Sequence, residues 1–318
     1  MKKTHAVAVV GSGLIGQAWT LVFARAGCEV RMWDGDLAAL QRARDLVAEL
    51  ADELEHSGLV DNAAELMSHV RVCNELSDAL KNVDYVQESL PEILSVKQAM
   101  YAQLDALVPA HAVIGSSTSS IPASAFTEHM KTRERCLVAH PVNPPYLIPV
   151  VEVCGAPWTS PESVQACMDL MHSVNQKPVH IRRELEGFIL NRLQGALLRE
   201  AFRLVEQGYV DVDGLDVTIR EGLGLRWSFM GPFETIDLNA PGGLADYCGR
   251  YGSMYQSISQ EQASTEPWSP ELIDQLQKAR REMLPSEALG DRRNWRDRRL
   301  MALALHKKQL ESDPSTRS

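Results

Sequence analysis

A glycine-rich turn near the start of the chain constrains the fold more than any other feature of the sequence. It reads Gly11-Ser12-Gly13-Leu14-Ile15-Gly16, and it follows a short β-branched run at residues 4–10. Residues 14–26 then show a helical pattern that ends at Gly27. In this strand–turn–helix context, G-x-G-x-x-G lets a dinucleotide pyrophosphate approach the backbone at a helix N-terminus. We therefore predict that the cofactor contacts Gly11, Gly13, Leu14, Ile15 and Gly16.

An acidic residue follows the second predicted strand, at residues 29–33. This residue is Asp34, and it stands where dinucleotide-binding folds place an acid that binds the adenosine ribose hydroxyls. Gly35 comes next instead of an arginine, so no cation here would neutralise a 2′-phosphate. The sequence predicts NAD rather than NADP, with Asp34 as a ligand. A glycine turn with a surface aspartate is the structural alternative, and a flavin would make the purified protein yellow.

Strand-like and helical segments alternate along the first part of the chain. Further strand-like runs occur at residues 70–73, 83–87, 112–116, 135–139, 149–153 and 178–181, and long helical stretches at 37–56 and 161–173. This alternation is typical of a doubly wound parallel sheet. We predict an α/β fold whose residues 1–185 form a Rossmann-like NAD-binding domain.

From Gly187 onward the sequence shows helical patterns and no convincing strand. Helices are expected near residues 187–207, 213–221, 231–250, 270–282 and 293–309. The first of these is apolar over most of its surface, a pattern typical of a helix buried in a domain or subunit interface. We predict an all-helical C-terminal domain over residues 186–318.

Composition and charge exclude several classes of protein. The 318 residues carry a formal net charge of −10, which makes the chain a poor generic partner for nucleic acid or an anionic membrane. No apolar run approaches the roughly 18 residues of a membrane helix, and the apolar run after Lys3 ends too early, at Gly11, for a signal peptide. The six cysteines are scattered without zinc spacing. We expect a cytoplasmic protein with reduced cysteines and no metal site.

Polar residues with catalytic chemistry follow the predicted strands. Oxidising a secondary alcohol requires an acceptor for the hydride, which a nicotinamide supplies, and a base for the hydroxyl proton. His140 suits the base, because imidazole has an ordinary pKa of about 6.5. Glu152 can fix its tautomer if the chain folds back between strands 135–139 and 149–153. Ser119 and Asn191 can donate hydrogen bonds to the reacting oxygen.

Each of these residues also has a structural explanation. His140 can be a hydrogen-bonded histidine at a strand end, and Glu152 can pair with a lysine or arginine. Ser119 belongs to the serine-rich loop Ser116-Ser117-Thr118-Ser119-Ser120, and Asn191 lies in an apolar helix. The joint occurrence of all four at these spacings favours the catalytic interpretation.

Four features occur together in this sequence: the glycine fingerprint, the serine cluster, the His140-to-Glu152 spacing and the motif G-F-x-x-N-R at residues 187–192. With them the chain resembles the 3-hydroxyacyl-CoA dehydrogenase family over nearly its whole length. Residues 140–146 and 222–239 are most similar to its λ-crystallin/L-gulonate 3-dehydrogenase branch. The resemblance implies that His140 is the general base, Glu152 its partner, and Ser119 and Asn191 contacts to the reacting oxygen. It further implies cofactor contacts at Glu92 and Lys97, and a homodimer.

The substrate expected from these features is a small carboxylate. Ser117 stands where the acyl-CoA enzymes usually have asparagine in S-N-T-S, which weighs against acyl-CoA chemistry but not against dehydrogenation. The helix after Asp34 is rich in acids, with Arg42 and Arg44 only at its start, and these acids repel an anionic nucleotide tail; the structural alternative is a solvated helix face. Arg226 is a candidate clamp for a free carboxylate, with an interface salt bridge as the alternative. We predict oxidation of a 3-hydroxy acid such as L-gulonate to the 3-keto acid.

Other substrates and functions stay open from the sequence. Carnitine is one, because Trp227, Phe229 and Tyr247 can form an aromatic site for a trimethylammonium group. The basic stretch at residues 292–299 can bind RNA or phosphate, although its interleaved acids favour a salt-bridged helix packed on the second domain. A crystallin-like protein without turnover is the third class, which steady NADH production would exclude.

Overall fold

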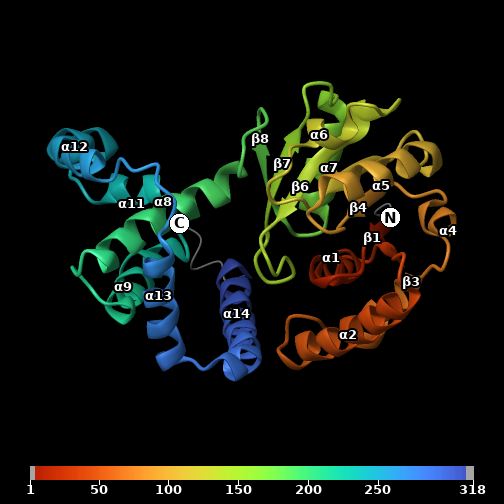
Figure 1. The fold of residues 1–318 in the computed structure, drawn as a ribbon. Helices are drawn as coiled ribbons and strands as arrows, with labels where there is room; N and C mark the ends of the chain where they lie inside the picture. The colour runs from red at the N-terminus through yellow and green to blue at the C-terminus, as the bar shows by residue number, and fades with distance from the viewer. Residues whose placement is uncertain (1–3, 313–318) are drawn as a thin grey trace. The chain divides into compact units, whose positions relative to one another are not determined.

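The computed structural model describes residues 4–312, which form two compact units (Figure 1). The first unit contains residues up to Leu190 together with those from Asn294 onward, and the second contains residues 191–293. The sequence predicts a second domain over residues 186–318, whereas the structure groups residues from Asn294 onward with the first unit. The reason is packing, because Met301 is buried in the core of the first unit and Leu305 lies beside Gly58.

The first unit is built on an eight-stranded sheet in the order β3-β2-β1-β4-β5-β6-β7-β8. Its strands are β1 (Ala6–Val10), β2 (Glu29–Trp33), β3 (Val70–Val72), β4 (Tyr85–Glu88), β5 (Val113–Ser116), β6 (Cys136–Pro141), β7 (Val150–Gly155) and β8 (Lys177–Ile181). The described strands pair in parallel except for β6 and β7, which are antiparallel. Only residues 142–149 join β6 to β7, which is too short for the crossover that a parallel pair needs.

Helices cover both faces of this sheet, as the alternation of segments predicts. They are α1 (Leu14–Arg25), α2 (Leu37–His56), α3 (Ala63–Ser68), α4 (Leu76–Leu80), α5 (Leu94–Leu107), α6 (Ala123–Thr127) and α7 (Pro161–Ser173), with a short 3-10 helix at Arg133–Arg135. Val7 and Val9 of β1 pack in the same core cluster as α1, α2 and α7, whereas Ala8 and Val10 pack in the same cluster as α5 and α6. This division follows from the two-residue period of a strand, and it confirms the doubly wound architecture.

The described chain after residue 187 contains no strand, in agreement with the prediction. Its helices are α8 (Phe188–Glu206), α9 (Val212–Val217), α10 (Gly224–Trp227), α11 (Pro232–Leu238), α12 (Gly243–Glu261), α13 (Pro270–Met283) and α14 (Leu289–Ser312), with a π-helical turn at Thr218–Leu223 and a 3-10 helix at Ser286–Ala288. None of the helices in the described part of the chain is long and apolar enough to cross a membrane.

The predicted single helix over residues 231–250 is wrong, because the structure divides it into α11 and α12. Pro241 and Gly242 lie between these helices, and Gly243 at the start of α12 has a φ of +73°, which glycine adopts without strain. The Asp237 carboxylate accepts a hydrogen bond from the N–H of Leu244 (2.7 Å), so a polar contact fixes the break.

Candidate active site

The glycine loop joins β1 to α1 and brings backbone segments into close contact. Gly11 has a φ of +101°, and a Cβ atom there would lie 2.7 Å from the carbonyl oxygen of Ser89. A Cβ atom on Gly16 would overlap the carbonyl oxygen of Gly11. Both glycines are therefore required by the fold itself.

Gly13 has a different environment, which suits a bound phosphate. A Cβ atom there would meet no described protein atom within 4 Å, so nothing in the described chain requires a glycine. Gly13 is also the N-cap of α1, and its position provides no side-chain hydrogen bond to the first turn. Open space beside uncapped N–H groups fits the pyrophosphate of a dinucleotide. Leu14 is exposed at this helix start, and Ile15 is half-buried.

The Asp34 carboxylate lies against the middle of the glycine loop. Its Oδ2 accepts hydrogen bonds from the N–H (2.7 Å) and the hydroxyl (2.8 Å) of Ser12, and its Oδ1 accepts one from the N–H of Asp36 (2.9 Å). These bonds hold the carboxylate beside the place where the phosphates would bind. This is the location that a ligand of the adenosine ribose requires.

His140 and Glu152 form a buried pair across the antiparallel strands. They are directly opposite each other in the register of β6 and β7, and His140 Nδ1 lies 2.9 Å from Glu152 Oε2. The other carboxylate oxygen accepts hydrogen bonds from the N–H groups of Ile189 (2.8 Å) and Leu190 (2.9 Å) at the start of α8. His140 is 6% exposed and Glu152 is 2% exposed.

The ionisation of Glu152 determines which histidine nitrogen can act as a base. Burial opposes ionisation, but the hydrogen bonds from His140 and from the N–H groups of Leu190 and Ile189 outweigh it, so the pKa of this carboxyl is lowered. An ionised carboxylate only accepts hydrogen bonds, so Nδ1 of His140 must be the donor. The lone pair of the neutral ring is then on Nε2.

Phe188 packs against the His140–Glu152 pair, and the sequence did not predict this contact. Its ring centroid lies 5.5 Å from that of His140, and its side chain is fully buried. Phe188 is also the first residue of α8, so it links the histidine to the two N–H groups that bind Glu152. A phenylalanine at a helix start gives no local signal for this role.

The serine loop is held by Glu92, which lies just before α5. Glu92 Oε1 accepts hydrogen bonds from the hydroxyls of Thr118 (2.6 Å) and Ser120 (2.9 Å) and from backbone N–H groups of the loop. Ser119 is exposed on this loop, and its N–H is one of those donors (3.1 Å).

Lys97 lies in the core rather than at an open surface. It is fully buried, and its Nζ donates hydrogen bonds to both oxygens of Glu88 (2.9 and 3.0 Å). The predicted cofactor contacts at Glu92 and Lys97 stay predictions. Glu88 itself was missed, although an acid at the end of a buried apolar strand must find a cation.

Ser117 is fully occupied by protein partners. Its Oγ accepts hydrogen bonds from Trp19 Nε1 (3.1 Å) and Gln87 Nε2 (2.7 Å), and it lies 2.9 Å from the hydroxyl of Ser89. One hydroxyl has two lone pairs and one hydrogen, so these three contacts use its capacity. The residue that departs from S-N-T-S is therefore part of the support of the loop.

The two remaining candidates belong to the second unit. Asn191 is half-buried on α8, and Arg226 is exposed on α10. Arg226 has no ion-pair partner among the described residues. Their roles in binding substrate stay predictions.

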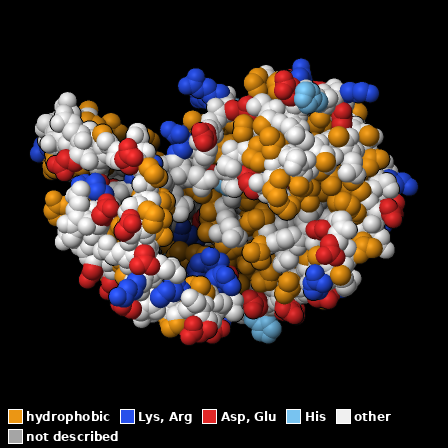
Figure 2. All heavy atoms as spheres, viewed as in Figure 1, with side chains coloured by type: hydrophobic (Ala, Val, Ile, Leu, Met, Phe, Trp, Pro, Cys, Tyr) orange, Lys and Arg blue, Asp and Glu red, His pale blue; other side chains and the backbone are white. Residues whose placement is uncertain are grey.

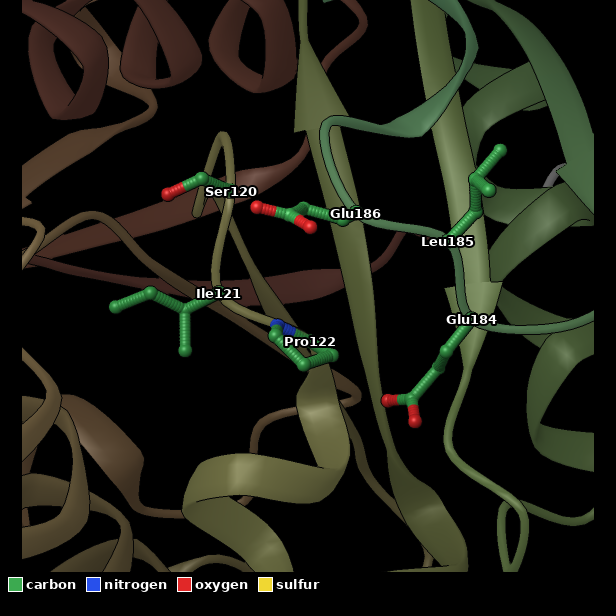
Figure 3. A pocket seen from close by; sticks show the side chains of 6 residues that line it. All are labelled: Ser120, Ile121, Pro122, Glu184, Leu185 and Glu186. Atoms are coloured by element: carbon green, nitrogen blue, oxygen red, sulfur yellow. The ribbon is translucent and has the colours of Figure 1, made fainter. Parts of the chain in front are cut away.

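A pocket of about 450 Å³ opens beside the serine loop in the first unit. Its walls are residues 120–122 on one side and residues 184–186 on the other. Figure 3 shows the carboxylates of Glu184 and Glu186 directed toward the serine-loop side, with Leu185 turned away. Glu184 also accepts a hydrogen bond from the N–H of Ser124 (2.8 Å). Among residues 4–312 no cluster of His, Cys, Asp and Glu has the arrangement of a metal site.

Comparisons with known proteins agree with this geometry. Residues 6–185 match the family model of the 3-hydroxyacyl-CoA dehydrogenase NAD-binding domain, and residues 187–283 match the model of its C-terminal domain. The chain is 39% identical to the lambda-crystallin of Oryctolagus cuniculus over 96% of this chain and 97% of that protein. It is 37% identical to the L-carnitine dehydrogenase of Pseudomonas putida, over 85% and 82% of the two chains.

A solved structure extends the likeness to nearly the full length of the fold. It is a 5-formyl-3-hydroxy-2-methylpyridine 4-carboxylic acid 5-dehydrogenase described as an NAD⁺-dependent dismutase, with a TM-score of 0.81 and 27% identity. The alignment covers 98% of this chain and 99% of that one. The chain therefore belongs to the 3-hydroxyacyl-CoA dehydrogenase family and is an NAD-dependent dehydrogenase that acts on a CH–OH group.

Proposed function

We propose that this dehydrogenase oxidises the 3-hydroxyl group of a small free hydroxy acid such as L-gulonate to the 3-keto acid. The observation that carries the chemistry is the buried contact of His140 Nδ1 with an ionised Glu152 carboxylate. This contact leaves Nε2 as the atom that takes the hydroxyl proton. Glu152 stabilises the imidazolium that forms, and NAD, when bound, accepts the hydride.

Ser119 and Asn191 are proposed to donate hydrogen bonds to the substrate oxygen as negative charge develops on it. Loss of one such donor raises a reaction barrier by roughly 2.7–4 kcal/mol in enzymes where it has been measured. The Phe188 ring packs at a tilt against the imidazole, with ring centroids 5.5 Å apart. The proposed division of labour assigns the cofactor, the base and the Ser119 contact to the first unit, and it assigns the Asn191 and Arg226 contacts and dimerisation to the helical residues 191–293.

The described surface disfavours a large anionic acyl-CoA. Helix α2 follows the ribose-binding Asp34 and carries five acids on its later turns, Asp45, Glu49, Asp52, Glu53 and Glu55. Five negative charges repel the phosphates of a nucleotide tail. Ser117 is also saturated by protein contacts, so it does not replace the asparagine of S-N-T-S as a ligand.

A carnitine-like substrate is the second candidate, and one observation favours it. The pocket beside the serine loop is lined by Glu184 and Glu186, whose negative charges suit a trimethylammonium group. The L-carnitine dehydrogenase relative, at 37% identity, is consistent with that chemistry. For the free hydroxy acid, Arg226 is proposed to hold the carboxylate.

A substrate panel tests this proposal. NADH or NADPH production is followed with L-gulonate, 3-hydroxybutyrate, L-carnitine and 3-hydroxybutyryl-CoA. We expect turnover of a free hydroxy acid with NAD, and at least tenfold lower kcat/KM with NADP. Strong preference for the CoA thioester would contradict the free-acid proposal, whereas preference for carnitine would select the second candidate.

One variant links the panel to the carboxylate clamp. Arg226→Met is expected to raise KM for the preferred acid by about tenfold or more, because it removes a charge-assisted contact worth roughly 1.5–3 kcal/mol. Arg220→Met is the matched control, since Arg220 is exposed in the same unit and pairs with Glu221 (2.6 Å). Equal effects of the two substitutions would remove Arg226 from the site.

We also propose that the enzyme is a cytoplasmic homodimer. The six cysteines are free, and five of them are buried, as expected in a reducing compartment. Large apolar side chains are exposed on the second unit: Leu193, Leu225, Phe229, Phe233 and Leu238 are each 61–75% exposed. Figure 2 shows hydrophobic side chains on the visible face of this unit, among charged ones. A second copy would cover such a surface.

A further inference from the structure

We propose that Glu92 is a positioning residue whose carboxylate holds the loop Thr118–Ile121 in the conformation that presents Ser119 to the substrate. The inference rests on the proposed role of Ser119 in the reaction. It goes beyond that role because it assigns to Glu92 the task of holding the loop, in addition to the cofactor contact predicted for it.

One carboxylate oxygen binds the entire turn. Glu92 Oε1 accepts from the Thr118 hydroxyl (2.6 Å), from the Ser120 hydroxyl and N–H (both 2.9 Å), and at longer range from the N–H groups of Ser119 (3.1 Å) and Ile121 (3.4 Å). Three successive backbone N–H groups thus converge on one anion, as in the anion-binding concavities formed by tight turns.

Thr118 is the central member of this arrangement. Its side chain is fully buried, and its hydroxyl donates to Glu92 while it accepts from the N–H of Ile121 (2.9 Å). The hydroxyl therefore closes the turn on itself as well as onto the carboxylate. Ser119 lies between these fixed points, so its place in space depends on both.

The carboxylate is itself held from the opposite side. Lys97 Nζ lies 3.9 Å from Glu92 Oε2 and bonds to Glu88, which in turn accepts from the hydroxyl of Ser116 (2.5 Å). Ser116 ends β5 and begins the serine loop. The loop is thereby bound to the Glu88–Lys97 pair at its start and to Glu92 along its turn.

These contacts use Glu92 Oε1 for the loop, since three of its partners are at 2.9 Å or less. Glu92 Oε2 lies 3.9 Å from Lys97 Nζ and keeps capacity for a cofactor hydroxyl. Burial opposes ionisation of this carboxyl, but the hydrogen bonds from Thr118 and Ser120 and the charge of Lys97 lower its pKa. The anion that binds the loop is therefore present throughout the neutral range.

Three variants test the proposal on the full-length enzyme. Thr118→Val has the same shape as the wild-type residue and removes only the hydroxyl, Thr118→Ser keeps the hydroxyl, and Glu92→Gln removes the charge. The measurements are kcat and KM for the preferred hydroxy acid, NADH affinity by fluorescence titration, and amide hydrogen exchange of peptides covering residues 117–122.

We expect Thr118→Val and Glu92→Gln each to lower kcat/KM for the hydroxy acid by about tenfold, because each weakens a hydrogen bond to a charged group. Exchange in residues 117–122 should accelerate in both variants, and Thr118→Val should leave NADH affinity within twofold of wild type. Thr118→Ser should keep both kcat/KM and exchange near the wild-type values. The double variant should lose little more than either single variant, because both act on one contact.

A different pattern overturns the proposal. If Glu92→Gln weakens NADH binding about tenfold while Thr118→Val changes neither exchange nor kcat/KM, Glu92 is a cofactor ligand and not a clamp. The proposed function can also fail by itself. If the wild-type enzyme oxidises none of the hydroxy acids but amide exchange is faster in both variants, Glu92 holds the loop and the proposed function is refuted.

Discussion

The sheet unit and the helical unit differ in how their candidate functional residues are held. In the sheet unit, His140 is paired with Glu152, and Glu92 is bound to the serine loop by several hydrogen bonds. In the helical unit, Arg226 is exposed, and Phe233 is 75% exposed. The first set is organised before any ligand binds. The second set presents exposed charge and apolar surface, which we propose that substrate or a second copy covers.

This difference determines what a substitution in each unit can do. A buried pair has already lost its hydration, so deleting one partner outright costs about 3–5 kcal/mol. A substitution that keeps a neutral hydrogen-bonding side chain costs less, about 1 kcal/mol. An exposed side chain has water as an alternative partner, so its substitution changes association rather than folding. Variants in the two units should therefore affect different properties. We expect the largest change in kcat, a smaller change in dimer affinity, and the smallest change in the free energy of unfolding.

The largest effect is expected for His140→Gln. Glutamine keeps hydrogen-bonding capacity but cannot take a proton, so kcat should fall by roughly 10²–10⁴-fold, the range of general-base catalysis. Steady-state kinetics with the preferred hydroxy acid measure this loss, and NADH affinity should change little. His172→Gln is the control, because His172 is exposed on α7. A kcat within tenfold of wild type would show that another group is the base.

An intermediate effect is expected in the helical unit for Phe233→Arg. A charge in place of an exposed aromatic residue should weaken a dimer by on the order of 100-fold, which corresponds to about 3 kcal/mol. Sedimentation at several concentrations measures the change, with Leu107→Arg as the control because Leu107 is an exposed leucine of the sheet unit. A wild-type protein that is monomeric at all concentrations would refute the proposed homodimer.

The same comparison explains which parts were predictable from the sequence. The β1–loop–α1–β2 order depends on residues that are neighbours in the chain, and local patterns predicted it. The contact between His140 and Glu152 was also predictable, because a short link between two strands forces the antiparallel pairing that brings them together. The break between α11 and α12 was missed, although Pro241 and its two glycines indicated it.

Contacts between distant segments were not predictable in this way. Glu92 binds a loop 26 to 29 residues away, and no local pattern distinguishes it from a solvent-exposed glutamate. Met301 returns to the core of the first unit, whereas the helical pattern around it gives only a helix and not its partner. The roles proposed for Arg226 and Phe233 in the helical unit involve a substrate or a second copy of the chain. Patterns within one sequence therefore predict less about them.

The smallest effect is expected on the free energy of unfolding and on its pH dependence. The variant is Glu152→Gln, and Glu234→Gln is its control. Hydrogen bonds from His140 and from two backbone N–H groups outweigh burial and lower the pKa of Glu152 in the folded state. A lowered folded-state pKa stabilises the protein above the ordinary carboxyl pKa, and this contribution is lost as the pH falls through the folded-state value.

Glu152→Gln should therefore lower the free energy of unfolding at pH 7 by about 1 kcal/mol, the difference between charged and neutral hydrogen bonds. The gap between the variant and wild type should narrow as the pH falls below about 4.3, the ordinary pKa of glutamate. Urea unfolding at pH 7 and at stepwise lower pH measures it. Glu234 is exposed on α11, so Glu234→Gln should change stability by less than about 0.5 kcal/mol throughout. If the free energy of unfolding depends on pH equally in the two variants, the folded state stabilises the ionised Glu152 carboxylate no more than an exposed one. The contrast drawn between the two units would then be wrong for Glu152.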